Sequence, residues 1–129
     1  MLNTKFYHSF PDLTVKLKGT TGTLKSPYYP QTYTIAQLSA TYRLEVPDGH
    51  VKLNFTELTL SNNDLVRVHD GFGTSGEVLG DYRNKSIHGL PVVLSSGNRM
   101  TVVFYSFSSY EKGPFFRFLA VFTRETKGS

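Results

Sequence analysis

The chain has 129 residues, a formal net charge of +4 and no cysteine, which excludes a disulfide framework, a thiolate zinc site and a cysteine nucleophile. Hydrophobic residues make up 39% of the chain and charged residues 19%, a composition typical of a folded domain and not of a disordered segment. The lysines and arginines are scattered without a basic stripe, and no apolar run is long enough to span a bilayer, so we expect neither nucleic-acid binding nor membrane insertion.

Apolar and polar residues alternate in several segments, which in chain order cover residues 13–17, 42–46, 51–55, 66–68, 100–104 and 116–122. A period of two places one face of a segment in a core and the other in water, which predicts β-strands. In this pattern Asn54 and His69 fall on the outer faces of their strands and are expected to meet solvent. No segment has the period of a long helix, and a single helical turn is conceivable only in residues 34–40.

The connections between these segments carry turn residues. Ser26-Pro27 and Tyr29-Pro30 favour extended or turn backbone, because proline restricts the residue before it. Pro47-Asp48-Gly49 predicts a tight turn, and Gly71 and Gly97 stand where a turn needs a positive φ. Short strands separated by turns at this spacing predict an all-β fold, a two-sheet antiparallel β-sandwich, with residues 1–129 as a single domain.

Recognisable sequence blocks follow one another along the chain. They are residues 22–33 with Ser26-Pro27 and Tyr29-Pro30, residues 42–55 with a Pro-x-Gly turn, residues 64–71 from Asp64 to Gly71, Leu79-Gly80-Asp81-Tyr82, Ser95-Ser96-Gly97-Asn98 with the apolar strand after it, and the aromatic strand 116–122. No single block is specific, but in this order, over residues 18–122, they resemble the CUB domain family. The resemblance implies a compact, jelly-roll-like CUB topology.

The chain departs from the family in its cysteines. CUB domains commonly carry disulfides, whereas this chain has no cysteine, and Arg83 stands where a cysteine often follows Leu-Gly-x-Tyr. We therefore expect a divergent or engineered member of the family that is stabilised by its core alone.

The calcium ligands of the family are also incomplete. Only Tyr33 and Asp64 match the ligand pattern that the resemblance implies, since no glutamate precedes Asp64 and Phe107 replaces the late aspartate. Calcium requires several oxygen ligands with enough negative charge to offset its dehydration, and Glu57 and Asn63 are the nearest substitutes. We therefore expect no metal and no other cofactor, with Tyr33 and Asp64 as remnants of a degenerate calcium site.

Aromatic residues are concentrated in segments that a CUB-like sandwich would bring to one end. They are Tyr28, Tyr29, Tyr33, Tyr105, Phe107 and Tyr110. Exposed tyrosine offers a large amphipathic surface with few rotamers and is a common anchor at protein interfaces. The predicted binding residues are Tyr33, Asp64, Tyr105, Phe107, Tyr110 and Lys112. Two sequons, at Asn54 and Asn84, are candidates for N-glycosylation.

These observations predict a non-catalytic, calcium-independent protein–protein interaction module, secreted or in the ectodomain of a membrane protein, and part of a larger multidomain protein. An enzyme is not expected, because there is no Gly-x-Ser-x-Gly nucleophile elbow and the acids Glu57 and Asp64 form a pair that any sandwich could contain. Two alternatives stay open. One is a module that binds a carbohydrate or polyanionic glycan through lysines and arginines on an outer sheet face, and the other is a structural domain that self-associates as a homo-oligomer.

Overall fold

The computed structural model describes residues 12–31, 38–61, 64–83, 89–106 and 116–126. Within these residues the backbone forms nine strands and no helix: β1 (Asp12–Lys18), β2 (Thr21–Lys25), β3 (Leu38–Glu45), β4 (His50–Thr59), β5 (Leu65–Asp70), β6 (Val78–Arg83), β7 (Val92–Leu94), β8 (Arg99–Ser106) and β9 (Arg117–Glu125). The described part of the chain accordingly holds no helix long and apolar enough to cross a membrane. The all-β prediction is confirmed.

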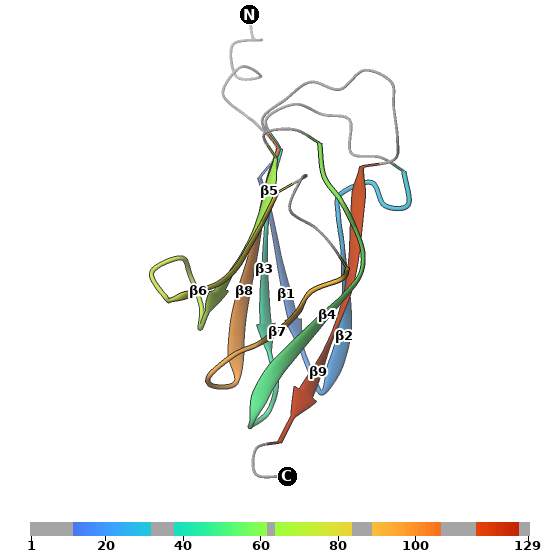
Figure 1. Ribbon diagram of the computed structural model, residues 1–129. Coiled ribbons are helices and arrows are strands. Elements are labelled where there is room, and N and C mark those ends of the chain that lie inside the picture. The colour runs from blue at the N-terminus through green and yellow to red at the C-terminus, as the bar shows by residue number, and fades with distance from the viewer. Residues whose placement is uncertain (1–11, 32–37, 62–63, 84–88, 107–115, 127–129) are drawn as a thin grey trace, which may run out of the picture.

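The strands form two sheets that pack face to face (Figure 1). The five-stranded sheet has the order β1-β3-β8-β5-β6, and the four-stranded sheet has the order β2-β9-β4-β7. All hydrogen-bonded neighbours are antiparallel except β1 and β3, which run parallel from the pair Asp12 and Ser39 to the pair Lys18 and Glu45. The predicted two-sheet sandwich is therefore confirmed, with one parallel pair at an edge of the larger sheet.

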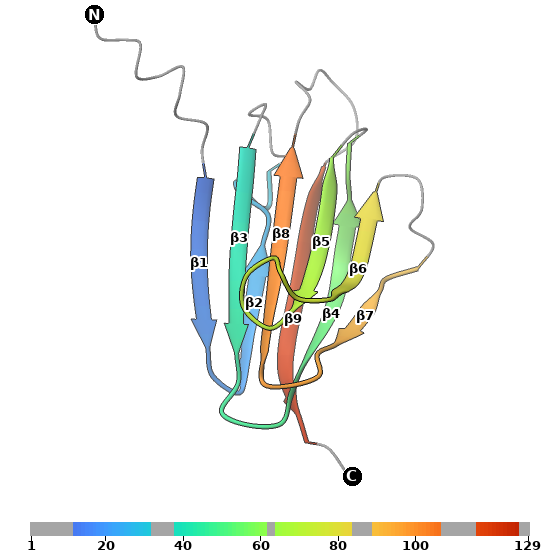
Figure 2. The same ribbon diagram turned by 90° about the vertical axis from the view of Figure 1, so that its left-hand side faces the viewer.

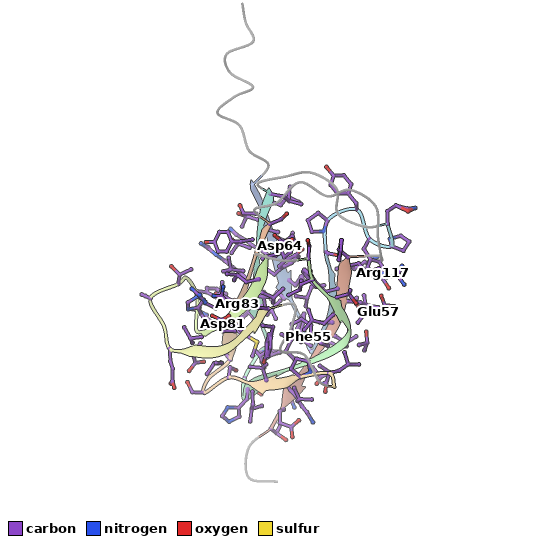
Figure 3. The ribbon with its side chains drawn as sticks, turned by 45° about the horizontal axis from the view of Figure 1, so that its top comes forward. Phe55, Glu57, Asp64, Asp81, Arg83 and Arg117 are labelled. Carbon is purple, nitrogen blue, oxygen red and sulfur yellow. The ribbon has the colours of Figure 1, made fainter. Side chains whose placement is uncertain are left out.

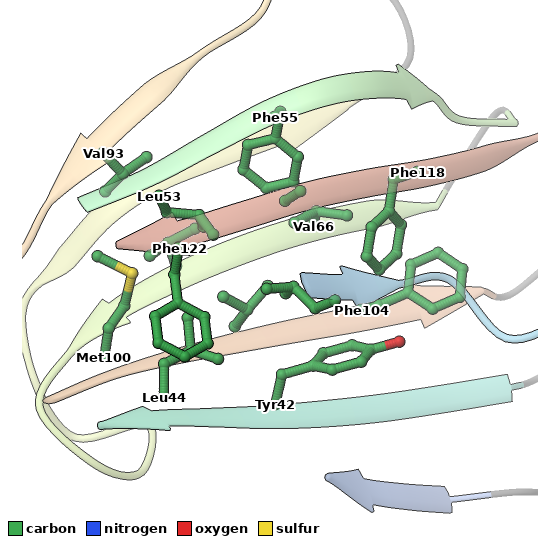
Figure 4. Close-up of a cluster of buried hydrophobic side chains, with 14 of the residues drawn as sticks. Tyr42, Leu44, Leu53, Phe55, Val66, Val93, Met100, Phe104, Phe118 and Phe122 are labelled. Carbon is green, nitrogen blue, oxygen red and sulfur yellow. The ribbon is translucent and has the colours of Figure 1, made fainter. Parts of the chain in front are cut away.

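The core between the sheets is rich in aromatic side chains (Figure 4). The ring of Phe118 is fully buried and meets the rings of Phe104 and Tyr42 edge to face, with centroid separations of 5.4 and 5.9 Å. The Tyr42 hydroxyl donates a 2.6 Å hydrogen bond to the carbonyl of Lys25, and burial raises the pKa of Tyr42. Burying one such aromatic side chain contributes about 1.5–3 kcal/mol, so that a core of this kind stabilises the sandwich without disulfides.

The loop between β5 and β6 folds back over the outer face of the five-stranded sheet (Figure 2). The buried hydroxyl of Thr101 donates to the carbonyl of Gly71 at 2.8 Å and accepts from the amide of Gly73 at 3.0 Å. His69 does lie on the outer face, but only 5% of it is exposed, because the loop covers it and its Nδ1 lies 3.2 Å from the carbonyl of Gly76. The expectation that His69 meets solvent is therefore wrong.

The two glycines expected at positive φ behave differently. Gly71, with a φ of 74°, adopts the left-handed backbone that the turn before Phe72 requires. Gly97 does not adopt a positive φ, so that this prediction is wrong. Its turn is held instead by Ser95, whose hydroxyl donates a 2.6 Å hydrogen bond to the carbonyl of Gly97.

Arg83, which stands where the family often has a cysteine, belongs to an ionic network on the outer face of β5 and β6. Asp81 accepts hydrogen bonds from Arg67 Nε at 3.0 Å and from Arg83 Nε at 2.9 Å (Figure 3). These hydrogen bonds, above all the one from Arg83, lower the pKa of Asp81. The pair of Arg67 and Asp81 therefore links β5 to β6 non-covalently, and Arg83 joins that pair from β6 itself.

Candidate binding site

The strand ends that flank residues 26–37, 60–64 and 107–116 gather at one end of the sandwich, which we call the loop end (Figure 1). Register confirms this grouping, since Leu38 pairs with Ser106 and Thr59 with Arg117. Of the predicted binding residues, Asp64 and Tyr105 lie at the loop end. The others lie outside the described residues, as does the sequon residue Asn84: these are Tyr33, Phe107, Tyr110 and Lys112.

Residues 26–31 form an arm of two overlapping tight turns at the loop end. The amide of Tyr29 donates to the carbonyl of Ser26 at 3.1 Å, and the amide of Gln31 donates to the carbonyl of Tyr28 at 2.7 Å. Pro27 occupies the second position of the first turn and Tyr28, with a φ of 70°, the third, which is the geometry of a type II turn. That position normally takes glycine, because a side chain in left-handed backbone costs about 1–2 kcal/mol.

The arm is attached to strand β9 at both of its ends. Ser26 is buried, and the amide of Phe118 donates to its hydroxyl oxygen at 2.9 Å. The bond between Tyr29 and Pro30 is cis, and the carbonyl of Pro30 accepts a 2.7 Å hydrogen bond from Arg117 Nη1. The Arg117 guanidinium also lies 5.4 Å from the centroid of the Tyr29 ring. The arm is therefore pre-organised, and it presents Tyr28 with 50% of its surface exposed.

A bulge in β4 brings a carboxylate to the arm. Pairing with β9 shifts between Phe55 and Glu57, so that Leu58 rather than Glu57 faces the core. Glu57 Oε1 lies 2.9 Å from Arg117 Nε, and the two side chains are neighbours in Figure 3. Burial and a side-chain hydrogen bond to Glu57 raise the pKa of Tyr29. Arg117 therefore links Glu57 and Tyr29 beneath the arm, through an ion pair to one and a ring contact to the other.

Among the described residues, the acids at the loop end do not gather into one cluster. Asp64 is fully buried, and its amide donates a 3.2 Å hydrogen bond to the carbonyl of Ser61. Glu57, the nearest substitute ligand that the structure describes, is already paired with Arg117 and lies apart from Asp64 (Figure 3). In the described ranges no group of three or more histidine or acidic side chains comes close enough to hold a metal ion.

Tyr105 and Asn54 occupy the outer faces of the two sheets. Tyr105 is half-buried on β8, where its cross-strand neighbours are Ser39 and Leu65. Asn54 is half-buried on β4, between Val92 on one side and Val121 on the other. Tyr105 therefore lies at the loop end, but on the outer face of the five-stranded sheet. Asn54 points outward from the four-stranded sheet, as the alternation predicts.

Sequence reasoning missed the residues that fix the arm. Arg117 follows the alternating pattern of its strand and reads as an ordinary outward cation between Phe116 and Phe118. Its partner Glu57 belongs to the same sequence neighbourhood as the core residue Phe55, and only the bulge directs it outward. The signal for Tyr28 was present, since a residue that follows Ser-Pro and precedes Tyr-Pro must sit in a tight turn.

The chain was compared with known protein families and structures. The family model that matches is described as CUB domain and covers residues 14–117. The zinc metalloproteinase nas-39 of Caenorhabditis elegans is 31% identical over 82% of this chain and 11% of its own length. Cubilin of Rattus norvegicus is 29% identical over 97% of this chain and 4% of its own length. The chain thus spans only a small part of these relatives.

Solved structures agree with the family match. The structure of the CUB1-EGF-CUB2 domains of rat MASP-1 is 27% identical and superposes with a TM-score of 0.69, over 85% of this chain and 42% of that one. The matched residues 14–117 include most of β1, all of β2 to β8 together with the arm, and the first residue of β9. Because the family model matches well over half of the sequence, the chain belongs to the CUB domain family.

Proposed function

We propose that the chain is a non-catalytic module that binds a protein partner through the loop end, without calcium. The observation that carries this proposal is Tyr28, which is 50% exposed although its φ of 70° belongs to a turn position that favours glycine. A strained residue persists only where the surrounding structure imposes it, and such residues are concentrated at functional sites. An exposed tyrosine held on a rigid arm loses little conformational entropy on binding, which is the property of an interface anchor.

The electrostatics of the arm support a calcium-independent mode. In metal-dependent binding, a cation would organise the loops and would need several free carboxylates. Here Arg117 takes that organising part, because it binds Glu57, the carbonyl of Pro30 and the face of Tyr29 at once. A guanidinium that belongs to the chain requires no free ion, so that the arm keeps its shape when calcium is absent.

The family supports a module within a larger extracellular protein. In the rat MASP-1 structure CUB domains stand beside an EGF domain, and this chain matches 11% of the metalloproteinase and 4% of cubilin. A match confined to so small a part of an enzyme does not extend to its catalysis. We therefore infer an accessory binding role, in a secreted protein or the ectodomain of a membrane protein.

The proposal can be tested by screening the purified domain against an array of extracellular protein ectodomains. Each partner found is then measured against the wild type and Tyr28→Gly, with calcium and with EDTA. Glycine adopts the φ of 70° without strain, so that this variant removes the side chain and leaves the turn in place. We expect saturable binding that weakens at least 10-fold in Tyr28→Gly and is unchanged by EDTA, since an interface anchor is worth 1.4 kcal/mol or more.

A matched control is Leu94→Ala, which truncates a side chain of similar exposure (51%) opposite Lys52, toward the end of β4 that lies away from the loop end. Binding that fell equally in both variants would count against an anchor at Tyr28. Binding abolished by EDTA would refute calcium independence, and an array without any saturable partner would refute the binding role of this surface.

A further inference from the structure

Three of the six residues that line a small hollow on the outer face of the five-stranded sheet are cations. Its volume is about 270 Å³, and its lining includes Lys16 and Lys18 of β1, Arg43 and Glu45 of β3, and Phe72 of the β5–β6 loop. Three positive charges thus converge on the hollow against a single negative one. It lies away from Tyr28, on a sheet face instead of among the loops.

The register of the parallel pair places these cations together. Lys16 is opposite Arg43 and Lys18 is opposite Glu45, and all of these side chains lie on the outer face because Val15 and Leu17 pack against the core. An antiparallel edge strand with the same sequence would run in the opposite direction and would pair these residues differently. The parallel edge pair is therefore what forms the hollow.

Phe72 forms one wall, and its position is fixed. The loop that carries it is fastened by Thr101, through the hydrogen bonds to Gly71 at 2.8 Å and from Gly73 at 3.0 Å. The ring lies over two guanidiniums, with its centroid 4.7 Å from Arg99 Cζ and 5.9 Å from Arg43 Cζ. With 36% of Phe72 exposed, the hollow combines positive charge with an accessible apolar surface.

The cations that line the hollow are not neutralised by the chain. Arg43 Nε is buried and has no hydrogen-bond acceptor among the described residues. Lys16 and Lys18 take part in none of the ion pairs of the described part of the chain. Glu45, the one acid in the lining, instead lies 3.9 Å from Arg99. An anion bound in the hollow would therefore meet positive charge that the one acid of the lining does not balance.

The cations on the β5 and β6 part of this face are paired with an acid and do not extend the positive charge of the hollow. Asp81 engages both Arg67 and Arg83, at 2.9 Å each, so that the positive charge of β5 and β6 is largely compensated. A repeating polyanion needs cations at successive positions along its length. The uncompensated charge here is confined to the hollow, which suits one anionic group with an apolar neighbour.

We propose that this hollow binds an acidic side chain, from an extended segment of a protein partner in which an apolar residue adjoins the acidic one. The carboxylate accepts hydrogen bonds from Lys16, Lys18 and the terminal nitrogens of Arg43, and the apolar residue packs on Phe72. The site adds a second contact surface to the loop end, and it functions whether or not Tyr28 is an anchor.

The test is a titration of the isotope-labelled domain, followed by NMR at 50 mM salt, with a capped pentapeptide of alternating glutamate and leucine. We expect saturable shifts centred on residues 16–18, Arg43 and Phe72, an affinity that falls at least 5-fold in the double variant Lys16→Gln and Lys18→Gln, and a further fall as salt is raised. Both lysines are exposed, so that the variant is expected to fold; overlaid spectra away from the hollow verify this.

The matched control is the double variant Lys25→Gln and Lys52→Gln, which makes the same change in charge on the four-stranded sheet. This control and Tyr28→Gly should both bind the pentapeptide as the wild type does, and the glutamine analogue of the peptide should not bind. Equal losses in the two double variants, or shifts spread over all cationic surfaces, would overturn the proposal. It would also be overturned if a heparin-derived hexasaccharide bound the hollow in preference to the peptide, because that would identify a glycan site.

Discussion

The amide of Phe118, a core residue, donates a 2.9 Å hydrogen bond to the hydroxyl of Ser26, the first residue of the arm. Ser26→Ala would leave this buried amide without a partner, and we expect it to lower the free energy of unfolding by about 1–3 kcal/mol. Ser75→Ala, in an exposed loop, should change stability by less than about 0.5 kcal/mol. Urea denaturation measures both, and equal effects would show that the hydrogen bond does not stabilise the arm.

Tyr28→Gly should stabilise the domain. Glycine adopts a φ of 70° without the penalty of a side chain, so that the free energy of unfolding should rise by about 1 kcal/mol, partly offset by the greater backbone freedom of the unfolded chain. The exposed ring contributes little to the core and its loss should cost little. Thermal denaturation should therefore give a higher Tm for Tyr28→Gly than for the wild type.

Tyr28→Ala separates strain from the loss of the ring. Alanine removes the same aromatic group but retains a Cβ at the left-handed position, so that it should be less stable than Tyr28→Gly by about 1 kcal/mol. If both variants were equally stable, the turn would have relaxed in solution and Tyr28 would carry no strain.

The fold class was readable from the sequence because the sandwich buries one face of each strand. The alternation of Val51, Leu53 and Phe55 with polar residues gives the inward face of β4 directly, and those three side chains are indeed buried. The parallel pairing of β1 with β3 was not readable, since alternation records which face is buried and carries no information on strand direction.

The burial of His69 on the outer face could not be predicted, because it depends on a contact between segments that are distant in the sequence. The pattern of β5 places His69 outward, but the loop that covers it is fastened by Thr101, a residue of another strand. Thr101 is itself fully buried on that outer face. Local periodicity cannot anticipate a loop that folds back over a sheet, and for the same reason the hollow beside Phe72 was invisible in the sequence.

The candidate site was readable only in part. The Ser-Pro and Tyr-Pro pairs indicate tight turns, but the pairing of Glu57 with Arg117 depends on a bulge in β4 that shifts the register by one residue. Tyr33, Phe107, Tyr110 and Lys112 lie outside the described residues, so that their part in binding stays a prediction.

The ionic network at Asp81 should make stability depend on pH. Its hydrogen bonds, first that from Arg83, lower the pKa of Asp81 in the folded state, so that the ionised form stabilises the fold above the ordinary carboxyl pKa. This stabilisation is lost as the pH falls through the lowered pKa. Because Asp81 is about a third exposed (34%), we expect Asp81→Asn to cost only about 0.5–1 kcal/mol at pH 7.

The difference between the wild type and Asp81→Asn should therefore shrink toward zero as the pH falls below the lowered pKa of Asp81, in urea denaturation repeated across the acidic range. Asp48→Asn is the control, since the Asp48 carboxylate is 72% exposed and 3.4 Å from Arg124. That variant should behave as the wild type at every pH. A difference for Asp81→Asn that persisted undiminished at low pH would mean that the ion pairs are not its cause.

Asn54 should carry a glycan when the domain is secreted from mammalian cells behind an added signal peptide. Asn54 and Thr56 both face outward on β4, and the neighbouring Val92 is 58% exposed, so that a glycan at Asn54 would cover apolar surface on the four-stranded sheet. Mass spectrometry of the peptide containing Asn54, before and after enzymatic removal of N-glycans, measures the modification. Thr56→Val should abolish it with little change in fold, because the exposed Thr56 hydroxyl makes only a 3.2 Å hydrogen bond to the carbonyl of Leu119. An unmodified peptide from the secreted wild type would contradict this prediction. The apolar surface beside Asn54 would then stay exposed and be available for contact with another protein.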